Sequence, residues 1–280
     1  ILYHAQITIF GHQPFKGGFI GVDIFFVISG YLITSIILKE LNNTGTFSFK
    51  NFYERRVRRL LPALLLVMIV SFPFAWSYLS PVAFIDYSKS ILSSLFFSSN
   101  IYFYLTGIEY DGVGGIFKPY LHTWSLSVEE QYYILFPIFI ILTWRFGIKW
   151  ILIILSFVFM LSLGISEWGA YKIPSANFYL LPTRGWELLI GVFIAFYLKY
   201  NSYIKSYLAN QLLSMLGFSM IIYSIIVFSA STPFPSLYAL IPTIGTGLVI
   251  LCAIPQTTIH KLLSLNFIVG VGLISYSTYL

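Results

Sequence analysis

The hydrophobic positions of this 280-residue chain gather into long runs separated by short polar stretches. A helix that crosses a membrane needs roughly 20 mainly apolar residues. We therefore predict an all-α fold, a polytopic transmembrane helix bundle of about nine or ten helices. The predicted spans are about 1–10, 19–38, 60–80, 128–144, 149–166, 186–200, 211–230, 237–254 and 266–280.

Both ends of the chain fall inside apolar runs. The first run, ILYHAQITIF, starts at Ile1 without a charged leading region or a cleavage site, so it does not resemble a signal peptide. The last run, FIVGVGLISYSTYL, ends at Leu280. We expect the first and last helices to be truncated, and 1–280 to form a single membrane domain that is incomplete at both ends.

The composition agrees with a membrane protein and removes several other classes. Hydrophobic residues make up 58% of the chain and charged residues 9%, whereas a soluble domain carries about a quarter of its residues charged. The single cysteine, Cys252, excludes an internal disulfide and a cysteine-based metal site, and we expect no metal. The chain has no GxSxG, Walker A, HExxH or CxxC motif, so serine hydrolases, nucleotide hydrolases and zinc proteases have no support.

The segment 81–127 is the difficult part of the topology, because its apolar middle also holds Lys89 and several serines. Cytoplasmic loops collect Lys and Arg. If 81–127 stays on one side and the N-terminal side is cytoplasmic, the 16 Lys and Arg residues divide into 11 inside and 5 outside. A crossing segment would give 9 and 7, so we predict a long outer segment that is partly re-entrant. The net charge of +6 then comes from the excess of Lys and Arg on the predicted cytoplasmic side and does not indicate nucleic-acid binding.

Four arginines follow one another in the run FYERRVRRLLP. Arg55, Arg58 and Arg59 have the spacing of one helical face, and Pro62 suits the first turn of a helix. Positive groups at a helix N-terminus oppose the helix dipole unless an anion binds there, and guanidinium groups match phosphate oxygens. Two interpretations stay open. The cluster, with Arg56, is either a site for a phosphorylated ligand or a positive-inside anchor on lipid phosphates.

His4 and Asp23 are ionisable residues within apolar runs, at the outer ends of the first two predicted helices. An ionisable group at membrane depth costs at least a few kcal/mol, so it is usually paired or functional. His4 is the natural proton acceptor because histidine titrates near neutral pH, and Asp23 is a candidate to orient it or to hold the acceptor. A structural interfacial histidine is the alternative. Four nearby glycines are expected to permit close helix packing: Gly17, Gly18, Gly21 and Gly30.

The run HTWSLSVEEQ leads into the helix predicted to start at about 128. Ser127 and Glu130 fit a capping box, in which each side chain satisfies a backbone amide of the other. This explanation leaves out His122, Trp124 and Glu129. Two carboxylates and a histidine beside a helix N-terminus favour an acid–base or sugar-binding surface, with Trp124 stacking on a sugar ring.

Arg184 and Glu187 open another predicted helix and lie three residues apart. At this spacing they can form an ion pair that anchors the helix end. In the predicted topology they also face the outer side, so they are candidates to bind an acceptor.

Five runs of the sequence resemble acyltransferase family 3, the integral-membrane O-acyltransferases that include O-antigen acetylases. The runs occur in the same order as in the family. They span nearly the whole chain, which closes with ISYSTYL (274–280). Tyr132 stands where the family commonly has Phe. The resemblance implies one family domain over 1–280. The matching runs are YHA (3–5), GGFIGVDIFFVISGYLIT (17–34), FYERRVRRLLPAL (52–64), LHTWSLSVEEQYYILFP (121–137) and LPTRGWELLIG (181–191).

The resemblance implies an enzyme that moves an acyl group from cytoplasmic acyl-CoA, often acetyl-CoA, to a hydroxyl of an extracytoplasmic carbohydrate. Acyl-CoA is then a donor substrate and not a permanently bound cofactor. Lipopolysaccharide O-antigen, exopolysaccharide and peptidoglycan are the acceptor classes, and the bacterial inner membrane is the expected location. His4 matches the histidine of the family's Arg-x10-His motif.

Combined with the resemblance, the residue patterns predict three sets of site residues. The predicted catalytic residues are His4, Asp23, Glu129 and Glu130. The predicted donor-binding residues are Arg55, Arg56, Arg58 and Arg59. The predicted acceptor-binding residues are His122, Trp124, Ser125, Arg184 and Glu187.

Two other classes of protein share the hydropathy pattern and the interior charges. One is a transporter or flippase of a lipid-linked or acylated sugar, which would move its substrate without cleaving a thioester. The other is a binding or structural membrane protein. Following the label of radioactive acetyl-CoA into polysaccharide separates all three classes.

Overall fold

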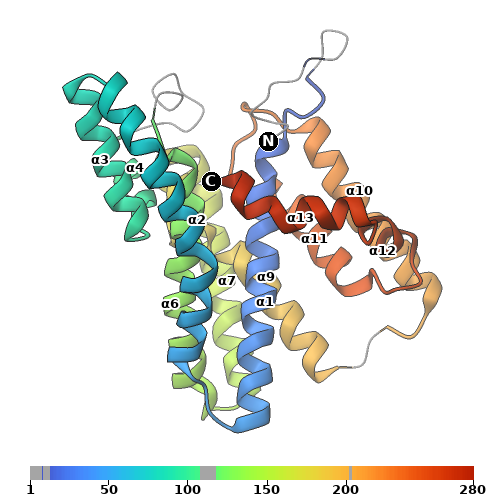
Figure 1. Cartoon of the computed structure of the whole chain (residues 1–280). Coiled ribbons are helices and arrows are strands. Elements are labelled where there is room, and N and C mark those ends of the chain that lie inside the picture. The colour runs from blue at the N-terminus through green and yellow to red at the C-terminus, as the bar shows by residue number, and fades with distance from the viewer. Residues whose placement is uncertain (1–7, 9–12, 108–117, 202–203) are drawn as a thin grey trace.

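The computed structural model describes residue 8 and the ranges 13–107, 118–201 and 204–280, whose regular structure is helical throughout. Six helices belong to stretches that are long and apolar enough to cross a membrane. They confirm the predicted all-α transmembrane bundle (Figure 1). These helices are α1 (Gly21–Thr44), α2 (Phe49–Tyr78), α6 (Trp124–Trp144), α7 (Ile148–Lys172), α9 (Leu181–Tyr200) and α10 (Tyr207–Val227).

The remaining helices are shorter than a membrane span. The span predicted over 237–254 is the 13-residue helix α11, and the one predicted over 266–280 is the 14-residue helix α13, which buries none of its residues. Figure 1 shows α13 lying across the long helices rather than along them. The span predicted over 1–10 falls almost wholly outside the described residues. The short helices are α3 (Pro81–Leu95), α4 (Ser99–Leu105), α8 (Pro174–Tyr179), α11 (Leu240–Cys252), α12 (Thr258–Leu263) and α13 (Asn266–Tyr279), with 3-10 turns η1 (Gly18–Ile20), η2 (Leu121–Thr123) and η3 (Leu237–Ala239).

Helices α1 and α9 form the centre of the bundle, and glycines let their backbones touch. A Cβ atom on Gly30 would lie 1.9 Å from the carbonyl oxygen of Leu188, and one on Gly191 would lie 2.0 Å from that of Val27. Only glycine permits such an approach, as in other membrane helix pairs. The packing role predicted for Gly30 is therefore confirmed, whereas Gly21 has open space around its Cβ position.

Helix α2 begins at Phe49, eleven residues before the predicted span. Ser48 caps it, because the Ser48 side chain accepts a hydrogen bond from the Asn51 amide at 3.3 Å. Pro62 therefore lies inside the helix and not in its first turn, so that prediction is wrong. The arginines occupy the second and third turns, where the argument from the helix dipole no longer applies.

Helix α6 also begins earlier than predicted, at Trp124, directly after η2. Ser127 and Glu130 thus lie within the helix, and the predicted capping box is wrong. The reason is a tertiary contact: the Ser127 hydroxyl accepts a hydrogen bond from the Ser99 amide of α4 at 3.2 Å.

The connection from α2 to α6 leaves and returns at one end of the bundle. Tyr53, near the start of α2, donates to the Tyr133 carbonyl in the middle of α6, and Ser71, near the end of α2, bonds to Tyr120, just before α6. The two helices are therefore antiparallel. We call the end at which α1 begins and α2 finishes the Asp23 end. Figure 1 shows α3 and α4 beside the upper part of α2, towards the Asp23 end.

Candidate active site

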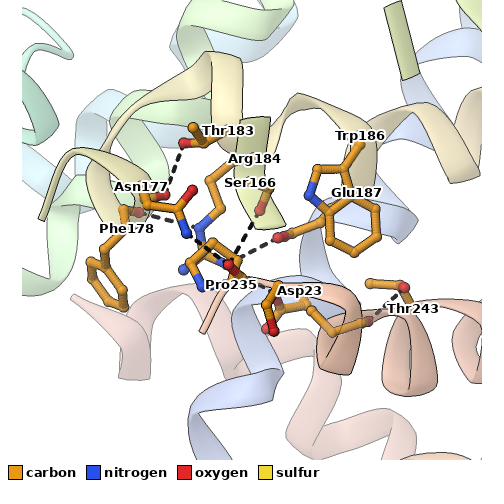
Figure 2. Close-up of polar contacts among 12 residues, drawn as sticks. Asp23, Ser166, Asn177, Phe178, Thr183, Arg184, Trp186, Glu187, Pro235 and Thr243 are labelled. Carbon is orange, nitrogen blue, oxygen red and sulfur yellow. Dashed lines mark hydrogen bonds and ion pairs between the residues drawn. The ribbon is translucent and has the colours of Figure 1, made fainter. Parts of the chain in front are cut away.

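A buried ion-pair triad joins α1 to α9 at the Asp23 end. The Arg184 Nη1 atom donates to Asp23 Oδ1 at 2.9 Å and to Glu187 Oε1 at 3.0 Å (Figure 2). The three side chains are at most 1% exposed. The Arg184–Glu187 pair suggested by the spacing therefore forms, and Asp23 joins it from a helix 161 residues away in the sequence.

Aromatic rings surround the guanidinium group of Arg184. Its Cζ atom lies 5.3 Å from the ring centroid of Trp124, 5.1 Å from that of Phe178 and 5.4 Å from that of Phe234. Its Nε atom donates to the Phe178 carbonyl at 3.2 Å. A desolvated cation over an aromatic ring gains about 2 kcal/mol. These rings therefore help to compensate for removing Arg184 from water.

Phe234 reaches this site because the loop that carries it is held by the neighbouring helices. The Pro235 carbonyl accepts hydrogen bonds from Asn177 Nδ2 at 2.7 Å and from Ser166 Oγ at 3.3 Å (Figure 2). Phe234 belongs to no recognisable motif, so it was not among the predicted site residues. Only the contact between this loop and α7 and α8 brings it to the triad.

A cavity of about 560 Å³ opens beside the triad. Four of the five predicted acceptor-binding residues line it, namely His122, Trp124, Ser125 and Arg184. The fifth, Glu187, lies behind Arg184 and is fully buried. Aromatic residues complete much of the wall: Phe19, Phe25, Phe178, Phe234, Tyr276 and Tyr279.

The segment before the cavity contains a tyrosine whose hydroxyl is kept neutral. Burial raises the pKa of Tyr120 to about 12, although the hydrogen bond with Ser71 works in the opposite direction. The phenol therefore remains protonated at neutral pH and can act as a hydrogen-bond donor.

Glu129 lies one turn deeper in α6 than the cavity and is 4% exposed. Its Oε1 atom accepts hydrogen bonds from the Ser29 hydroxyl of α1 and from the Tyr133 hydroxyl of α6. A carboxylate with two donors is held in one orientation. Neither Ser29 nor Tyr133 was among the predicted site residues, and Ser29 reaches Glu129 only through the packing of α1 on α6.

Glu130, the neighbouring carboxylate, is 7% exposed, and its Oε1 atom has no hydrogen-bond partner within the described ranges. Arg56 and Arg59 of α2 lie within electrostatic range of it. Arg56 points into the bundle, with its Cζ atom 5.8 Å from the ring centroids of Phe52 and Tyr133. The structure thus brings part of the arginine cluster to the two glutamates.

Arg55 and Arg58 face outward, and Arg59 is also exposed. Arg55 lies 4.0 Å from Glu40 and has a 58% exposed side chain, and Arg58 lies 2.6 Å from Glu54 with 78% exposure. An exposed ion pair of this kind contributes at most about 1 kcal/mol. Arg55 and Arg58 are thus placed at the surface of the bundle, unlike Arg56.

His4 lies outside the described residues, so its predicted contact with Asp23 is not part of the described site. Within the described ranges, Asp23 has Arg184 as its partner, and no group of three or more His, Cys, Asp or Glu residues could hold a metal ion. The described site therefore has two groups of buried carboxylates. In the first, Asp23 and Glu187 pair with Arg184. In the second, Glu129 and Glu130 lie within electrostatic range of Arg56 and Arg59.

These features define a multi-pass integral membrane protein with an aromatic-lined cavity, carrying a few polar groups, at one end of the bundle. The chain belongs to the acyltransferase family that it resembles, because the family model described as an acyltransferase domain matches residues 1–280. It is thus an O-acyltransferase domain.

Curated relatives agree with this assignment. The chain is 31% identical over 281 residues to peptidoglycan O-acetyltransferase OatA of Listeria monocytogenes, covering 95% of this chain and 44% of that protein. It is 31% identical over 291 residues to O-acetyltransferase OatA of Staphylococcus aureus, covering 100% of this chain and 47% of that protein. The chain thus spans a little under half the length of these relatives. No solved structure matches it.

Proposed function

We propose that the protein containing this domain transfers an acetyl group from cytoplasmic acetyl-CoA to a hydroxyl of an extracytoplasmic cell-wall polysaccharide. The observation that carries the proposal is the order of polar groups that follow or face η2 and α6. His122, Trp124 and Ser125 line the cavity, Glu129 and Glu130 follow one turn deeper, and Arg56 lies over the Tyr133 ring one turn beyond them.

Tyr276 of α13 connects the two ends of this series. It lines the cavity and lies within electrostatic range of Glu129, Glu130 and Arg59. An acyl transfer across the bilayer needs an anion-binding group towards one face, an acceptor pocket towards the other and a polar interior between them. The order of residues supports that division of roles.

The reaction that we propose is a direct transfer. The four arginines Arg55, Arg56, Arg58 and Arg59 bind the phosphate groups of CoA. His4 takes the proton from the acceptor hydroxyl. The oxygen then attacks the carbonyl carbon, the C–S bond of the thioester breaks as the C–O bond of the ester forms, and CoA leaves as a thiolate that takes up a proton.

The acceptor pocket is the aromatic cavity at the Asp23 end, which we place on the outer side of the bacterial inner membrane. Aromatic rings suit the faces of sugar rings, and Arg184 and Ser125 supply polar contacts. The name of the Listeria relative supports peptidoglycan as the acceptor, whereas O-antigen and exopolysaccharide are the other envelope polymers to test.

The test uses the full-length protein in membrane vesicles with radiolabelled acetyl-CoA inside and peptidoglycan fragments outside. We expect the radiolabel to appear on the polysaccharide, and free CoA to be released in an equal amount. His4→Ala should abolish transfer and leave the binding of CoA unchanged. Movement of substrate without cleavage of the thioester would show a transporter and overturn the proposal. Normal turnover of His4→Ala would remove His4 from its proposed role.

A further inference from the structure

His122 lines the cavity, and the residues on both sides of it form hydrogen bonds with buried hydroxyl groups of other helices. Two residues before His122 is Tyr120, and directly after it is Thr123. Each side-chain hydroxyl belongs to its own cluster of hydrogen-bonded hydroxyl groups, and the Thr123 hydroxyl also bonds to the Tyr120 carbonyl. α3 and α4, beside the upper part of α2 in Figure 1, supply several of the partners.

The first cluster holds Tyr120. Its hydroxyl lies 2.5 Å from that of Ser71 in α2, which in turn lies 2.8 Å from the hydroxyl of Tyr87 in α3. Tyr120 is 6% exposed and Tyr87 is 2% exposed. Two residues earlier, Lys118 forms an ion pair with Asp86 of α3. The chain is therefore fixed to α2 and α3 just before it enters η2.

The backbone of Tyr120 needs this support. Its φ angle is 63°, in the left-handed region that residues other than glycine rarely adopt. Such a conformation persists only where the surroundings hold it. The bonds of the Tyr120 ring hydroxyl and the following turn η2 together fix the direction in which the chain approaches His122.

The second cluster is centred on Thr123. Its hydroxyl lies 2.7 Å from that of Ser94 in α3, and it lies within donating distance of Ser99 Oγ at 2.9 Å and of the Tyr120 carbonyl at 2.7 Å. The Ser99 hydroxyl in turn lies 2.7 Å from the hydroxyl of Ser127 in α6. All four hydroxyl-bearing side chains are at most 1% exposed. Thr123, the residue directly after His122, is therefore connected to α3, to α4 and, through Ser99, to α6, and it also bonds to the Tyr120 carbonyl.

We propose that Tyr120 and Thr123 are positioning residues that fix the backbone on both sides of His122 and so aim its imidazole into the acceptor cavity. This inference rests on the proposed function. Buried hydroxyls also need partners simply to avoid a desolvation cost. The two clusters, however, also enclose His122, the residue between Tyr120 and Thr123 that lines the cavity.

The test compares the hydroxyl-deleting variant Thr123→Val with the conservative variant Thr123→Ser in the full-length protein. Thr123→Val should lower kcat by about tenfold or more and leave KM for acetyl-CoA unchanged, because small misplacements at a site cost up to about 100-fold in rate. Thr123→Ser should restore kcat. Thr243→Val is the matched control, because Thr243 is fully buried and, among the residues that the structure describes, its hydroxyl bonds to carbonyls three and four residues before it.

A double-mutant cycle shows whether Thr123 acts through His122. In a His122→Gln background, Thr123→Val should have no further effect on kcat, because residues that act through one group are not additive. Equal effects in both backgrounds would overturn the inference, as would a wild-type kcat in Thr123→Val. If Thr123→Val fails to accumulate in the membrane, Tyr120→Phe enters the same cycle with the same expectation. A wild-type protein that transfers nothing from acetyl-CoA would refute the proposed function, which is a separate result.

Discussion

The Nη1 atom of Arg184 in α9 lies 2.9 Å from the Oδ1 atom of Asp23 in α1, and both side chains are essentially inaccessible to solvent. Ionised groups at membrane depth are costly unless they are paired. The pair therefore constrains how α1 can sit against α9, and α1 also carries Ser29 to Glu129. The geometry of one buried centre is thus linked to that of the other through a single helix.

The triad predicts an order of stability among alanine variants. Arg184→Ala leaves two buried carboxylates without their cation and should cost about 3–5 kcal/mol of unfolding free energy. Asp23→Ala should cost less, since Arg184 keeps Glu187. Unfolding in detergent measures both. The control is Glu54→Ala, which removes an exposed pair and should change stability by no more than about 1 kcal/mol. Equal losses in all three variants would contradict this account.

Gly30→Ala should damage the α1–α9 contact, because its methyl group would fall 1.9 Å from a backbone carbonyl that cannot move aside easily. We expect a loss of at least about 1–3 kcal/mol, the usual cost of overpacking. Gly21→Ala is the matched control on the same helix, since its Cβ would meet nothing within 4 Å. Thermal unfolding of the purified variants measures the difference, and similar melting temperatures would argue against close packing as the role of Gly30.

The arginine cluster should divide into two pairs in donor binding. Arg56→Ala and Arg59→Ala should each weaken the binding of CoA by about 10-fold or more, as expected for loss of a charge-assisted hydrogen bond. Arg55→Ala and Arg58→Ala should have smaller effects, because these side chains already have exposed carboxylate partners. Arg59 is exposed as well, but it lies within electrostatic range of Glu129 and Glu130. Calorimetric titration with CoA measures all four. Unchanged affinity in every variant would return the cluster to a role as a lipid anchor.

Glu129 is predicted to be a catalytic residue alongside His4. Glu129→Gln should therefore lower kcat by about 100-fold, the lower range for loss of a positioned acid–base group, and leave the binding of CoA intact. Ser29→Ala and Tyr133→Phe should each give a smaller loss, because each removes one of the two donors that orient the carboxylate. Glu167→Gln is the control, since Glu167 contacts only the exposed Leu237 amide in the described structure. A wild-type kcat in Glu129→Gln would exclude Glu129 from the reaction.

Several features of the site could be predicted because they depend on neighbours in the sequence. His122, Trp124 and Ser125 lie in one short run, so their presence on one cavity wall follows from local structure. The Arg184–Glu187 pair follows from helical spacing. Phe234 and Ser29 could not be predicted, because each reaches the site through the packing of a distant element.

Hydropathy and short ordered motifs are local properties of the chain, and they were enough to identify a membrane-embedded helix bundle of the acyltransferase family. Which charges meet became visible only in the folded structure. It joined Asp23 to Arg184 across 161 residues, turned Arg56 inward, and started α2 at Phe49 and α6 at Trp124. The physical reason is that ion pairs, helix starts and buried hydroxyl bonds depend on partners supplied by other helices, and sequence spacing does not determine that packing.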